Sequence, residues 1–268
     1  MPNSIHPSSV VEDGAILGDG VTIGPFCHVG AGVTLGDGVR LISHAVVAGH
    51  TRIGARCRIF PFASIGHEPQ DLKYKGEKTT LVIGADCTMR EGVTINPGTA
   101  GDRGETTIGD RCVFLASSHV AHDCVVGSGV IFSNNAMLAG HCKIGDNVII
   151  GGGAGIHQFC RIGAHAFIGG LAGVENDVIP FGAALGNRAY LGGLNLVGMK
   201  RAGIARESIH AARRAFKEIF SSERPLQEAV GALDPELAAN PIVARIRDFI
   251  QAGGDRAFCT PIRNGREA

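Results

Sequence analysis

The stretch IGDRCVFLASSHVAHDCVVGSGVIF, residues 108–132, carries a large apolar side chain at every sixth position. These positions are Ile108, Phe114, Val120, Val126 and Phe132. An α-helix repeats every 3.6 residues and a simple strand every two, so neither accounts for a period of six. The spacing predicts a chain that turns a corner every six residues and places one apolar anchor on each straight side.

The same period extends through most of the chain up to Val174. It runs in one register from Ile5 to Ile65, resumes from Ile83 to Ile95, and continues from Ile108 to Val174 after a shift of one residue. Three sides of six residues close a triangular coil, and such coils stack at the strand spacing of about 4.8 Å. The sequence therefore predicts a parallel β-helix of the hexapeptide-repeat class. Members of that class wind left-handed, although the spacing alone does not give the hand.

Most of the eight cysteines follow an anchor by four residues, which is two positions before the next anchor. Side chains two apart on a strand point to the same side, so these thiols are predicted to face inward as small core residues. We expect them on separate coils and sides, an arrangement that does not converge on a zinc ion. They are Cys27, Cys57, Cys87, Cys112, Cys124, Cys142 and Cys160, while Cys259 lies outside the repeat.

Two segments interrupt the repeat, and the composition changes after the repeat ends. Residues 67–81 are polar and charged, and residues 98–107 are rich in glycine and charge. Long excursions from a regular solenoid are usually functional loops. We expect a left-handed parallel β-helical domain over residues 1–190 with these two inserted loops. An α-helical domain is expected over residues 191–268, because apolar residues recur at helical spacing between Glu207 and Phe220.

The bulk composition excludes several classes of protein. The formal net charge is zero, which is not the charge balance of a nucleic-acid-binding protein. Glycine contributes 40 of the 268 residues and tryptophan is absent, so the core must use small and branched side chains. No apolar run has the length of an integral membrane segment, and residues 1–10 lack the pattern of a signal peptide. We therefore expect a cytoplasmic protein with free thiols.

A step of one 18-residue coil brings polar residues from separate parts of the sequence to one corner. His122 follows its anchor by two residues, and the step leads to Gly140 and then to Gln158. Asp123 follows the anchor by three residues, and the same step leads to His141. The cluster predicted on this side consists of His119, His122, Asp123, His141, His157 and Gln158.

This pattern fits acyl transfer. Histidine is the side chain best suited to act as a base near neutral pH. The carboxylate of Asp123 can fix the tautomer of His122, and Gly140 can offer an unshielded backbone N–H to an oxyanion. The alternatives are a zinc site built from histidines at a subunit interface and a purely structural polar ladder.

A column of mostly small residues is predicted at another corner of the same coils. It consists of Ala116, Asn134, Gly152 and Gly170, each two residues after an anchor. Such a column leaves room for an extended acyl chain along the solenoid axis. A tight corner that requires glycine or asparagine gives the same pattern without any ligand.

Several motifs resemble one family of hexapeptide-repeat enzymes, the UDP-N-acetylglucosamine O-acyltransferases that begin lipid A synthesis. The matching motifs are QDLKY (70–74), HVAHDC (119–124), NNA (134–136), LAGH (138–141), HQF (157–159) and NLVGMKR (195–201). The resemblance runs from about His6 to the C-terminal helices. It is much more specific than the hexapeptide repeat, which many unrelated acyltransferases share.

The resemblance implies a homotrimer with active sites between subunits. It implies a (3R)-3-hydroxyacyl donor on the phosphopantetheine of acyl carrier protein, UDP-N-acetylglucosamine as acceptor, and neither a resident cofactor nor a metal. His122 would take the proton from the sugar 3-hydroxyl, Asp123 would orient His122, and the Gly140 N–H would stabilise the oxyanion. The residues matched to substrate contacts are Asp71, Lys73, His119, His141, His157, Gln158, Asn195 and Arg201.

The resemblance also makes Gly170 the acyl-length ruler, where glycine predicts a longer chain. Val197 stands where some members carry Glu, and Asn96-Pro97 replaces a His-Arg pair. Some members use a 3-amino UDP-sugar and make an amide, so that acceptor is one alternative. The sister N-acyltransferase usually has an extra domain before the repeat, whereas this repeat begins at Ile5.

An alternative from a different class is a zinc carbonic-anhydrase-like β-helix trimer, which needs three histidines on one metal. A basic cluster is also present at the start of the predicted helical domain. Acyl carrier proteins are acidic, so we expect this cluster to form the docking surface for the donor. Its residues are Arg201, Arg206, Arg213, Arg214 and Lys217.

Overall fold

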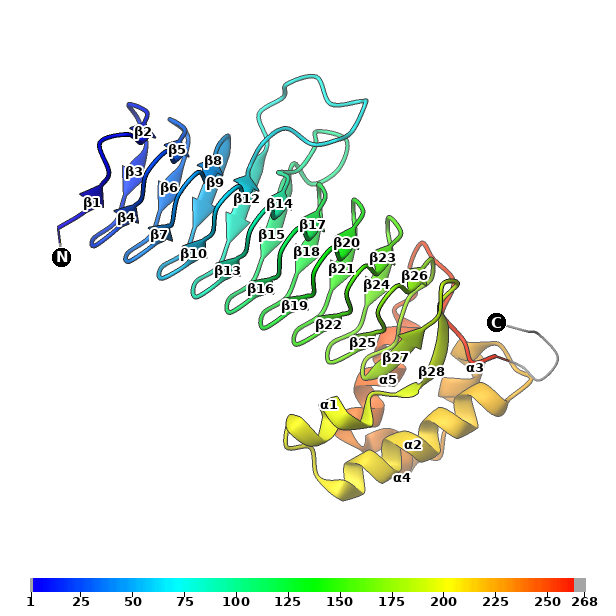
Figure 1. Cartoon of the computed structure of the whole chain (residues 1–268). Coiled ribbons are helices and arrows are strands. Elements are labelled where there is room, and N and C mark those ends of the chain that lie inside the picture. Colours follow the sequence, from blue (N-terminus) through cyan, green and yellow to red (C-terminus); the bar gives the residue numbers. More distant parts are fainter. Residues whose placement is uncertain (1, 263–268) are drawn as a thin grey trace.

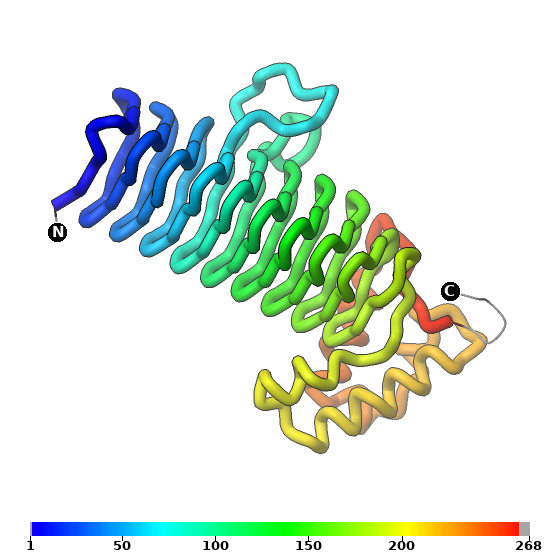
Figure 2. Tube along the Cα trace, in the orientation of Figure 1, coloured from blue at the N-terminus to red at the C-terminus, as the bar shows by residue number. Residues whose placement is uncertain are grey.

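The computed structural model describes residues 2–262 and forms a long triangular solenoid with helices packed at one end (Figure 1). Its three faces, here called A, B and C, are sheets of 11, nine and eight strands, and each coil crosses them in that order. The trace shows the coils stacked along one axis, with the N-terminus at the far end from the helices (Figure 2).

The strands of each face succeed one another along the axis. Face A consists of β1 (Ser4–Ile5), β4 (Thr22–Ile23), β7 (Arg40–Leu41), β10 (Arg58–Ile59), β13 (Thr88–Met89), β16 (Val113–Phe114), β19 (Ile131–Phe132), β22 (Ile149–Ile150), β25 (Phe167–Ile168), β27 (Gly182–Leu185) and β28 (Tyr190–Leu194). Face B consists of β2 (Val10–Val11), β5 (His28–Val29), β8 (Val46–Val47), β11 (Ser64–Ile65), β14 (Thr94–Ile95), β17 (His119–Val120), β20 (Met137–Leu138), β23 (Gly155–Ile156) and β26 (Gly173–Val174). Face C consists of β3 (Ile16–Leu17), β6 (Thr34–Leu35), β9 (His50–Ile53), β12 (Thr80–Ile83), β15 (Glu105–Ile108), β18 (Val125–Val126), β21 (Lys143–Ile144) and β24 (Arg161–Ile162).

The predicted anchors form the core of the solenoid. From Ile23 to Val174 every anchor is buried, and each is the second residue of a two-residue strand or the last residue of a longer one. Burial of each such side chain stabilises the fold by roughly 1.5–3 kcal/mol. In regular coils the anchors pair with a partner one coil away, as Val120 does with Leu138. The residue before each anchor therefore points outward, which places His119 on the outer surface of face B.

The corners turn through residues in the left-handed region of φ. Asp123 has φ 58° and His141 has φ 63°. This conformation costs a residue other than glycine roughly 1–2 kcal/mol, and asparagine and aspartate tolerate it best. At the corner between faces B and C, this conformation points two neighbouring side chains in different directions. Asp123 is buried, whereas the His122 side chain is 15% exposed.

The cysteines are buried free thiols, as expected, but their predicted scatter over separate sides is wrong. Cys57, Cys87 and Cys112 form a column at the corner between faces C and A, where their thiols donate to carbonyl oxygens of Gly84, Gly109 and Gly127 at 3.1–3.3 Å. Cys124, Cys142 and Cys160 form a second column between faces B and C. Burial raises the pKa of Cys160 to about 12, which keeps that thiol protonated.

Both excursions leave the solenoid at the end of face B and lie close together along one edge (Figure 1). They span residues 66–79 and 96–104. Their C-terminal ends lie two and three residues before the expected limits of 81 and 107. The reason is that residues 80–83 and 105–108 already pair with each other in face C.

The helices begin later in the sequence than expected, and the described chain continues beyond the last of them. β28 extends to Leu194 as an antiparallel partner of β27, so residues 191–194 belong to the solenoid. The helices are α1 (Leu196–Arg201), α2 (Arg206–Ser221), α3 (Leu226–Gly231), α4 (Pro235–Ala239) and α5 (Pro241–Gln251). After α5 the chain returns to the solenoid, where Phe258 bridges Asp177. Within residues 2–262 no helix combines the length and apolarity that crossing a bilayer requires.

Candidate active site

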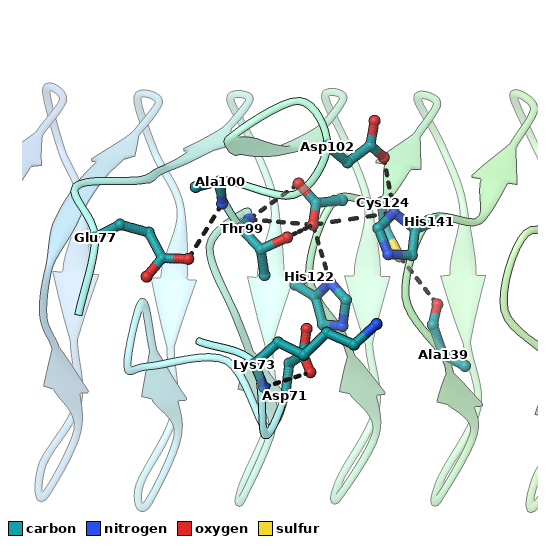
Figure 3. Close-up of polar contacts among 11 residues, drawn as sticks. Asp71, Lys73, Glu77, Thr99, Ala100, Asp102, His122, Cys124, Ala139 and His141 are labelled. Carbon is teal, nitrogen blue, oxygen red and sulfur yellow. Dashed lines mark hydrogen bonds and ion pairs between the residues drawn. The ribbon is translucent and has the colours of Figure 1, made fainter. Parts of the chain in front are cut away.

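His122 and Asp123 form a hydrogen-bonded pair at the corner between faces B and C (Figure 3). The distance between His122 Nδ1 and Asp123 Oδ2 is 2.9 Å. A carboxylate accepts hydrogen bonds, so Nδ1 carries the proton and Nε2 keeps its lone pair in the neutral ring. The histidine is thus oriented as a base, with its partner buried behind it.

Asp123 is held by a residue that the sequence did not predict, Thr99 of the second excursion. The Thr99 N–H lies 3.0 and 3.1 Å from the two carboxylate oxygens, and the Thr99 hydroxyl donates to Oδ2 at 2.6 Å. A buried carboxylate requires such hydrogen-bond donors. Thr99 therefore supplies two donors to Asp123 and fixes this carboxylate behind His122.

Gly140 lies beside His122, as the step of one coil predicted. A Cβ on Gly140 would lie 2.7 Å from Cε1 and 2.8 Å from Nε2 of His122, so only glycine leaves room for the ring. Within the described part of the chain, no acceptor pairs with the Gly140 N–H. This N–H is available to an oxyanion that forms next to His122.

His141 is the second histidine of the corner and has its own carboxylate partner. Its Nδ1 lies 2.7 Å from Oδ2 of Asp102, a residue of the second excursion, and 4.0 Å from Oδ2 of Asp123. Its ring meets the ring of His122 edge-on at 4.9 Å and stacks on Phe159 at 4.5 Å. The second excursion thus positions both histidines.

A groove of about 750 Å³ runs over face B in front of this corner. His119, His122, Gly140 and His157 contribute to its wall, and Gln70 reaches it from the first excursion. Small residues of later coils, Gly155 and Gly173 among them, extend it along the solenoid axis. The groove can therefore hold an elongated ligand against His122.

His119 lies on the wall of this groove, on the strand that precedes the corner. Its Nδ1 is 2.7 Å from the Thr94 hydroxyl. Burial, and then the nearby charge of His122, lower the pKa of His119 below 6.5. A neutral His119 can donate or accept a hydrogen bond without adding charge to the groove.

His157 and Gln158 lie further along the same corner and contact a residue from the C-terminal end. Arg256 Nη2 lies 2.6 Å from His157 Nδ1, and Arg256 Nε donates to the Gln158 carbonyl oxygen at 3.0 Å. His157 lines the groove, whereas Gln158 does not. Arg256 is a further residue that the sequence pattern did not reveal.

Asn195 and Arg201 are not brought to His122 within the single chain. They line a separate, mostly apolar cavity of about 690 Å³ between face A and α1. Asn195 caps α1, because its Oδ1 accepts from Gly198 N at 2.9 Å, and its Nδ2 donates to the His165 carbonyl at 3.0 Å. A ligand that contacts both these residues and His122 would require a second copy of the chain.

The other candidates lie at the margins of the groove. Asp71 and Lys73 belong to the turn of the first excursion, where Asp71 Oδ1 accepts from the Lys73 backbone at 3.0 Å (Figure 3). Within the described residues no hydrogen bond or ion pair joins either side chain to a histidine, although their neighbour Gln70 lines the groove. Gly170 lies at the corner between faces A and B, where a Cβ would meet only the Gly152 carbonyl oxygen, at 3.4 Å.

His122, Asp123 and His141 also lie close enough together to be candidate ligands of one metal ion. One ligand atom from each lies within 4.8 Å of the others. Zinc in such sites takes nitrogen lone pairs that converge on one point. Here Nδ1 of each histidine is hydrogen-bonded to a carboxylate, and Asp123 already accepts from Thr99 and His122. A third histidine ligand, which the carbonic-anhydrase alternative needs, is absent from the group formed by the described residues.

Sequence reasoning gave no role to Thr99 and Asp102 of the second excursion, to Gln70 of the first, or to Arg256 of the returning C-terminal segment. One signal for Thr99 was available, because it lies four residues after the anchor Ile95, the inward position that cysteine occupies elsewhere. Asp102, Gln70 and Arg256 carry no such signal, since they lie outside the repeat.

Comparison with known proteins tests the fold and the family. The family description "Bacterial transferase hexapeptide (six repeats)" matches residues 14–49, 105–140 and 141–176. The description "Udp N-acetylglucosamine O-acyltransferase; Domain 2" matches residues 177–259. A crystal structure of a UDP-N-acetylglucosamine acyltransferase is 41% identical, covers 97% of this chain and 100% of its own, and superposes with a TM-score of 0.93. The predicted left-handed parallel β-helix with a C-terminal helical domain is confirmed.

Curated relatives are more similar still. One from Methylobacterium radiotolerans is 62% identical over 258 residues, and one from Mesorhizobium japonicum is 57% identical over 262 residues. The first alignment covers 96% of this chain and 95% of the relative, and the second covers 98% and 94%. Both are named acyl-[acyl-carrier-protein]--UDP-N-acetylglucosamine O-acyltransferase. The enzyme from Moraxella catarrhalis, at 40% identity over 95% of this chain and 99% of its own, has a TM-score of 0.91. This chain therefore belongs to the UDP-N-acetylglucosamine O-acyltransferase family.

Proposed function

We propose that this chain transfers a (3R)-3-hydroxyacyl group from acyl carrier protein to the 3-hydroxyl of UDP-N-acetylglucosamine, the first step of lipid A biosynthesis. The observation that carries the proposal is the corner where His122, oriented by Asp123, lies against the side-chain-free Gly140 at the wall of the groove. The names of the curated relatives support the same two substrates. We place the reaction in the cytoplasm.

The reaction needs one base and one oxyanion site. His122 Nε2 takes the proton of the sugar 3-hydroxyl as its oxygen attacks the thioester carbon, and the carbonyl electron pair moves onto oxygen. The Gly140 N–H stabilises this oxyanion, and Asp123 stabilises the imidazolium. Collapse breaks the C–S bond, and His122 returns the proton to the phosphopantetheine thiolate. The step is complete with groups of the chain and of its two substrates, so the proposal contains neither a resident cofactor nor a metal.

The remaining candidates serve to bind substrate. His119 and His157 line the groove, and His141 and Gln158 lie beside His122 and His157 at the adjoining corner, which supports contacts with the UDP-sugar. Asp71 and Lys73 lie on the excursion whose Gln70 borders the groove, and they close over the acceptor. The open space at Gly170 leaves room for a long acyl chain.

We further propose a homotrimer in which the edge between faces A and B lies on the three-fold axis. The groove belongs to face B and the cavity of Asn195 and Arg201 to face A, so this arrangement places one chain's cavity against the next chain's groove. The edge between them is unusually apolar, and two of its phenylalanines flank His44 with ring centroids 4.9 and 5.3 Å from it. Its exposed apolar residues are Phe26, Ile42, Phe62 and Leu171.

Mixing two inactive variants tests the shared site. His122→Ala and Arg201→Ala trimers should each lose most transfer activity, because each lacks one half of every site. Trimers reassembled from both variants should regain a fraction of wild-type activity, since some sites then receive His122 from one chain and Arg201 from its neighbour. Reassembled trimers without any regain, despite proven subunit mixing, would contradict a site shared between chains.

A basic groove offers a docking surface for the donor. It lies between α1 and α2, has a volume of about 480 Å³, and is lined by Lys200, Arg206, His210 and Arg213 around an apolar floor. Acyl carrier protein is acidic, so this charge supports docking there. The groove adjoins α1, which also carries Arg201, and so lies next to the proposed acceptor site.

The 3-amino UDP-sugar is a second candidate for the acceptor. Val197 supports it, because this exposed residue lines the cavity of Asn195 and Arg201 and stands where some members carry Glu. Asn96, the other departure, is buried and donates to the carbonyls of His67 and Glu68 at 3.1 and 3.2 Å. It therefore ties the two excursions together and does not face the sugar.

The decisive experiment measures acyl transfer from carrier-bound 3-hydroxyacyl groups of several lengths to UDP-N-acetylglucosamine and to its 3-amino analogue. We expect transfer to the first acceptor, and a loss of about 10²–10⁴-fold in His122→Ala with the trimer intact. The matched control is Asp13→Ala, at the same corner position of the first coil, which should keep full activity. Product with the amino analogue alone would shift the proposal to amide formation. No product with either, together with stoichiometric bound zinc, would replace it with metal chemistry.

A further inference from the structure

We propose that Arg256 is a positioning residue that holds His157 in the tautomer with its proton on Nε2, so that His157 donates a hydrogen bond to the acceptor nucleotide. The inference rests on the proposed function, because it takes the sugar nucleotide as the ligand of the groove. It assigns a role in substrate recognition to a segment that follows α5.

The contact itself fixes the position of the proton. Arg256 Nη2 lies 2.6 Å from His157 Nδ1, and Arg256 Nε lies 3.0 Å from the Gln158 carbonyl oxygen. A guanidinium has only donors and stays charged in proteins. Nδ1 must therefore accept, which leaves the ring proton of a neutral His157 on Nε2.

A competing bond shows what the arginine prevents. His157 Nδ1 also lies 3.3 Å from the Gln158 carbonyl oxygen. A carbonyl oxygen only accepts, so this bond requires the proton on Nδ1 and turns Nε2 into an acceptor. The two bonds exclude each other. Arg256 selects the first by donating to Nδ1 at the shorter distance.

Arg256 can exert this choice because the backbone that directly follows it is fixed. Asp177 N donates to the Ala257 carbonyl and Cys259 N donates to the Asp177 carbonyl, both at 2.8 Å. The Asp177 carboxylate is fully buried and accepts from the Arg161 backbone at 2.7 Å and from the Arg161 guanidinium at 2.6 Å. The backbone pairing beside Asp177 holds Arg256 close to His157, so Arg256 loses little conformational freedom when it binds the His157 ring.

The tautomer matters because the ligand of the groove offers acceptors. The diphosphate of a sugar nucleotide is anionic at neutral pH and has oxygens that only accept hydrogen bonds. His157 lines the groove together with His122. An Nε2–H adds a donor to that wall, whereas an unprotonated Nε2 would direct its lone pair at the ligand's oxygens and repel them.

The tautomer can be read directly by long-range ¹⁵N–¹H NMR on protein labelled at histidine, with His157→Gln used for assignment. We expect the wild type to carry the His157 proton on Nε2. In Arg256→Ala we expect the proton to move to Nδ1, toward the Gln158 carbonyl. Arg256→Lys should keep the wild-type form in part, because an ammonium group is also only a donor. A wild-type spectrum with the proton on Nδ1 would overturn the proposal.

Kinetics then connect the tautomer to recognition. Arg256→Ala should raise the KM for the acceptor nucleotide about tenfold with kcat changed little, and Arg256→Lys should recover part of the loss. In a His157→Ala background the same substitution should have no further effect on KM. Arg224→Ala, which removes an arginine between α2 and α3, should leave KM unchanged. An unaltered KM in Arg256→Ala, or equal effects with and without His157, would reject the role in recognition.

Binding of UDP, measured by calorimetry, separates this inference from the proposed function. If the wild type transfers no acyl group but binds UDP, and Arg256→Ala weakens that binding as the tautomer moves, the positioning role stands and the proposed reaction fails. If transfer occurs and neither tautomer nor binding responds to Arg256, the reaction stands and the positioning role fails.

Discussion

The corner between faces B and C carries different residues in the early coils and in the coils near the middle of the solenoid. In the early coils the residue two places after the anchor Val29 is Ala31, whose N–H donates to the Glu12 carboxylate at 2.9 Å. In the later coils the same position is Gly140, whose N–H has no acceptor within the described residues and lies beside His122. The same repeat thus forms one corner whose backbone N–H is already hydrogen-bonded and another whose N–H has no acceptor within the described residues.

The excursions account for the rest of the difference. Thr99 and Asp102 reach the later corner and bind Asp123 and His141, whereas the two coils before β8 have no inserted segment. The comparison indicates that the solenoid supplies evenly spaced positions, and that loops and single substitutions convert one of them into a site.

Among the changes that test this comparison, exchanging the two corner residues should produce the largest effect. In Gly140→Ala the new Cβ would lie less than 3 Å from the His122 ring and displace it, so transfer should fall about 10²–10³-fold. Single-turnover rates with saturating substrates measure this loss. The reciprocal change, Ala31→Gly, should cost roughly 0.5–1 kcal/mol of stability at most and leave the rate unchanged. Equal rates for Gly140→Ala and wild type would show that His122 does not need the space that glycine leaves at this corner.

A smaller effect is expected from the excursion. Thr99→Val removes the hydroxyl that donates to Asp123 but keeps the backbone N–H and the shape of the side chain. One hydrogen bond to a charged group contributes about 1.5–3 kcal/mol, so kcat should fall about ten- to a hundredfold while KM changes little. Thr22→Val, on the outer surface of β4, is the matched control and should leave both parameters unchanged. A rise in KM alone would assign Thr99 to substrate binding instead.

The smallest effect concerns the pH dependence of stability. Burial, and then His122, lower the pKa of His119 below 6.5, so the unfolded chain binds more protons than the folded one as the pH falls through that value. Stability from this residue is therefore present above pH 6.5 and is lost on acidification. Thermal unfolding between pH 8 and 5 should show Tm falling, with a shallower fall in His119→Gln and similar values at pH 8. His165, whose pKa burial also lowers, should contribute with the same sign. A steeper fall in the variant would contradict this account.

The period of six was sufficient to predict which side chains face inward and which corner residues meet. Stacking fixes both, because a regular coil returns to the same place after 18 residues, and Gly140 therefore lies beside His122. The prediction that the cysteines lie on separate sides failed in both columns. Cys124, Cys142 and Cys160 are 18 residues apart, so the step of one coil does place them at one corner, whereas the excursions hide the other column. Cys57, Cys87 and Cys112 are 30 and 25 residues apart, so a step of 18 does not reveal that they share a corner.

The contacts of the excursions and of the C-terminal segment could not be predicted from the repeat. Thr99 and Asp102 reach the histidines through loop conformations that no period specifies. Arg256 reaches His157 only because the chain folds through five helices and then pairs beside Asp177. Such contacts depend on tertiary packing, about which the pattern of a solenoid carries no information.

The pairing beside Asp177 has a consequence for biosynthesis. Each regular coil can settle on the previous one as it leaves the ribosome, because its partner strand is only 18 residues older. His157 does not obtain its final partner in this way, since Arg256 is synthesised 99 residues later. The nascent solenoid therefore stacks its coils before the groove can acquire its finished wall, which is complete only after the helices have emerged and the following segment has docked.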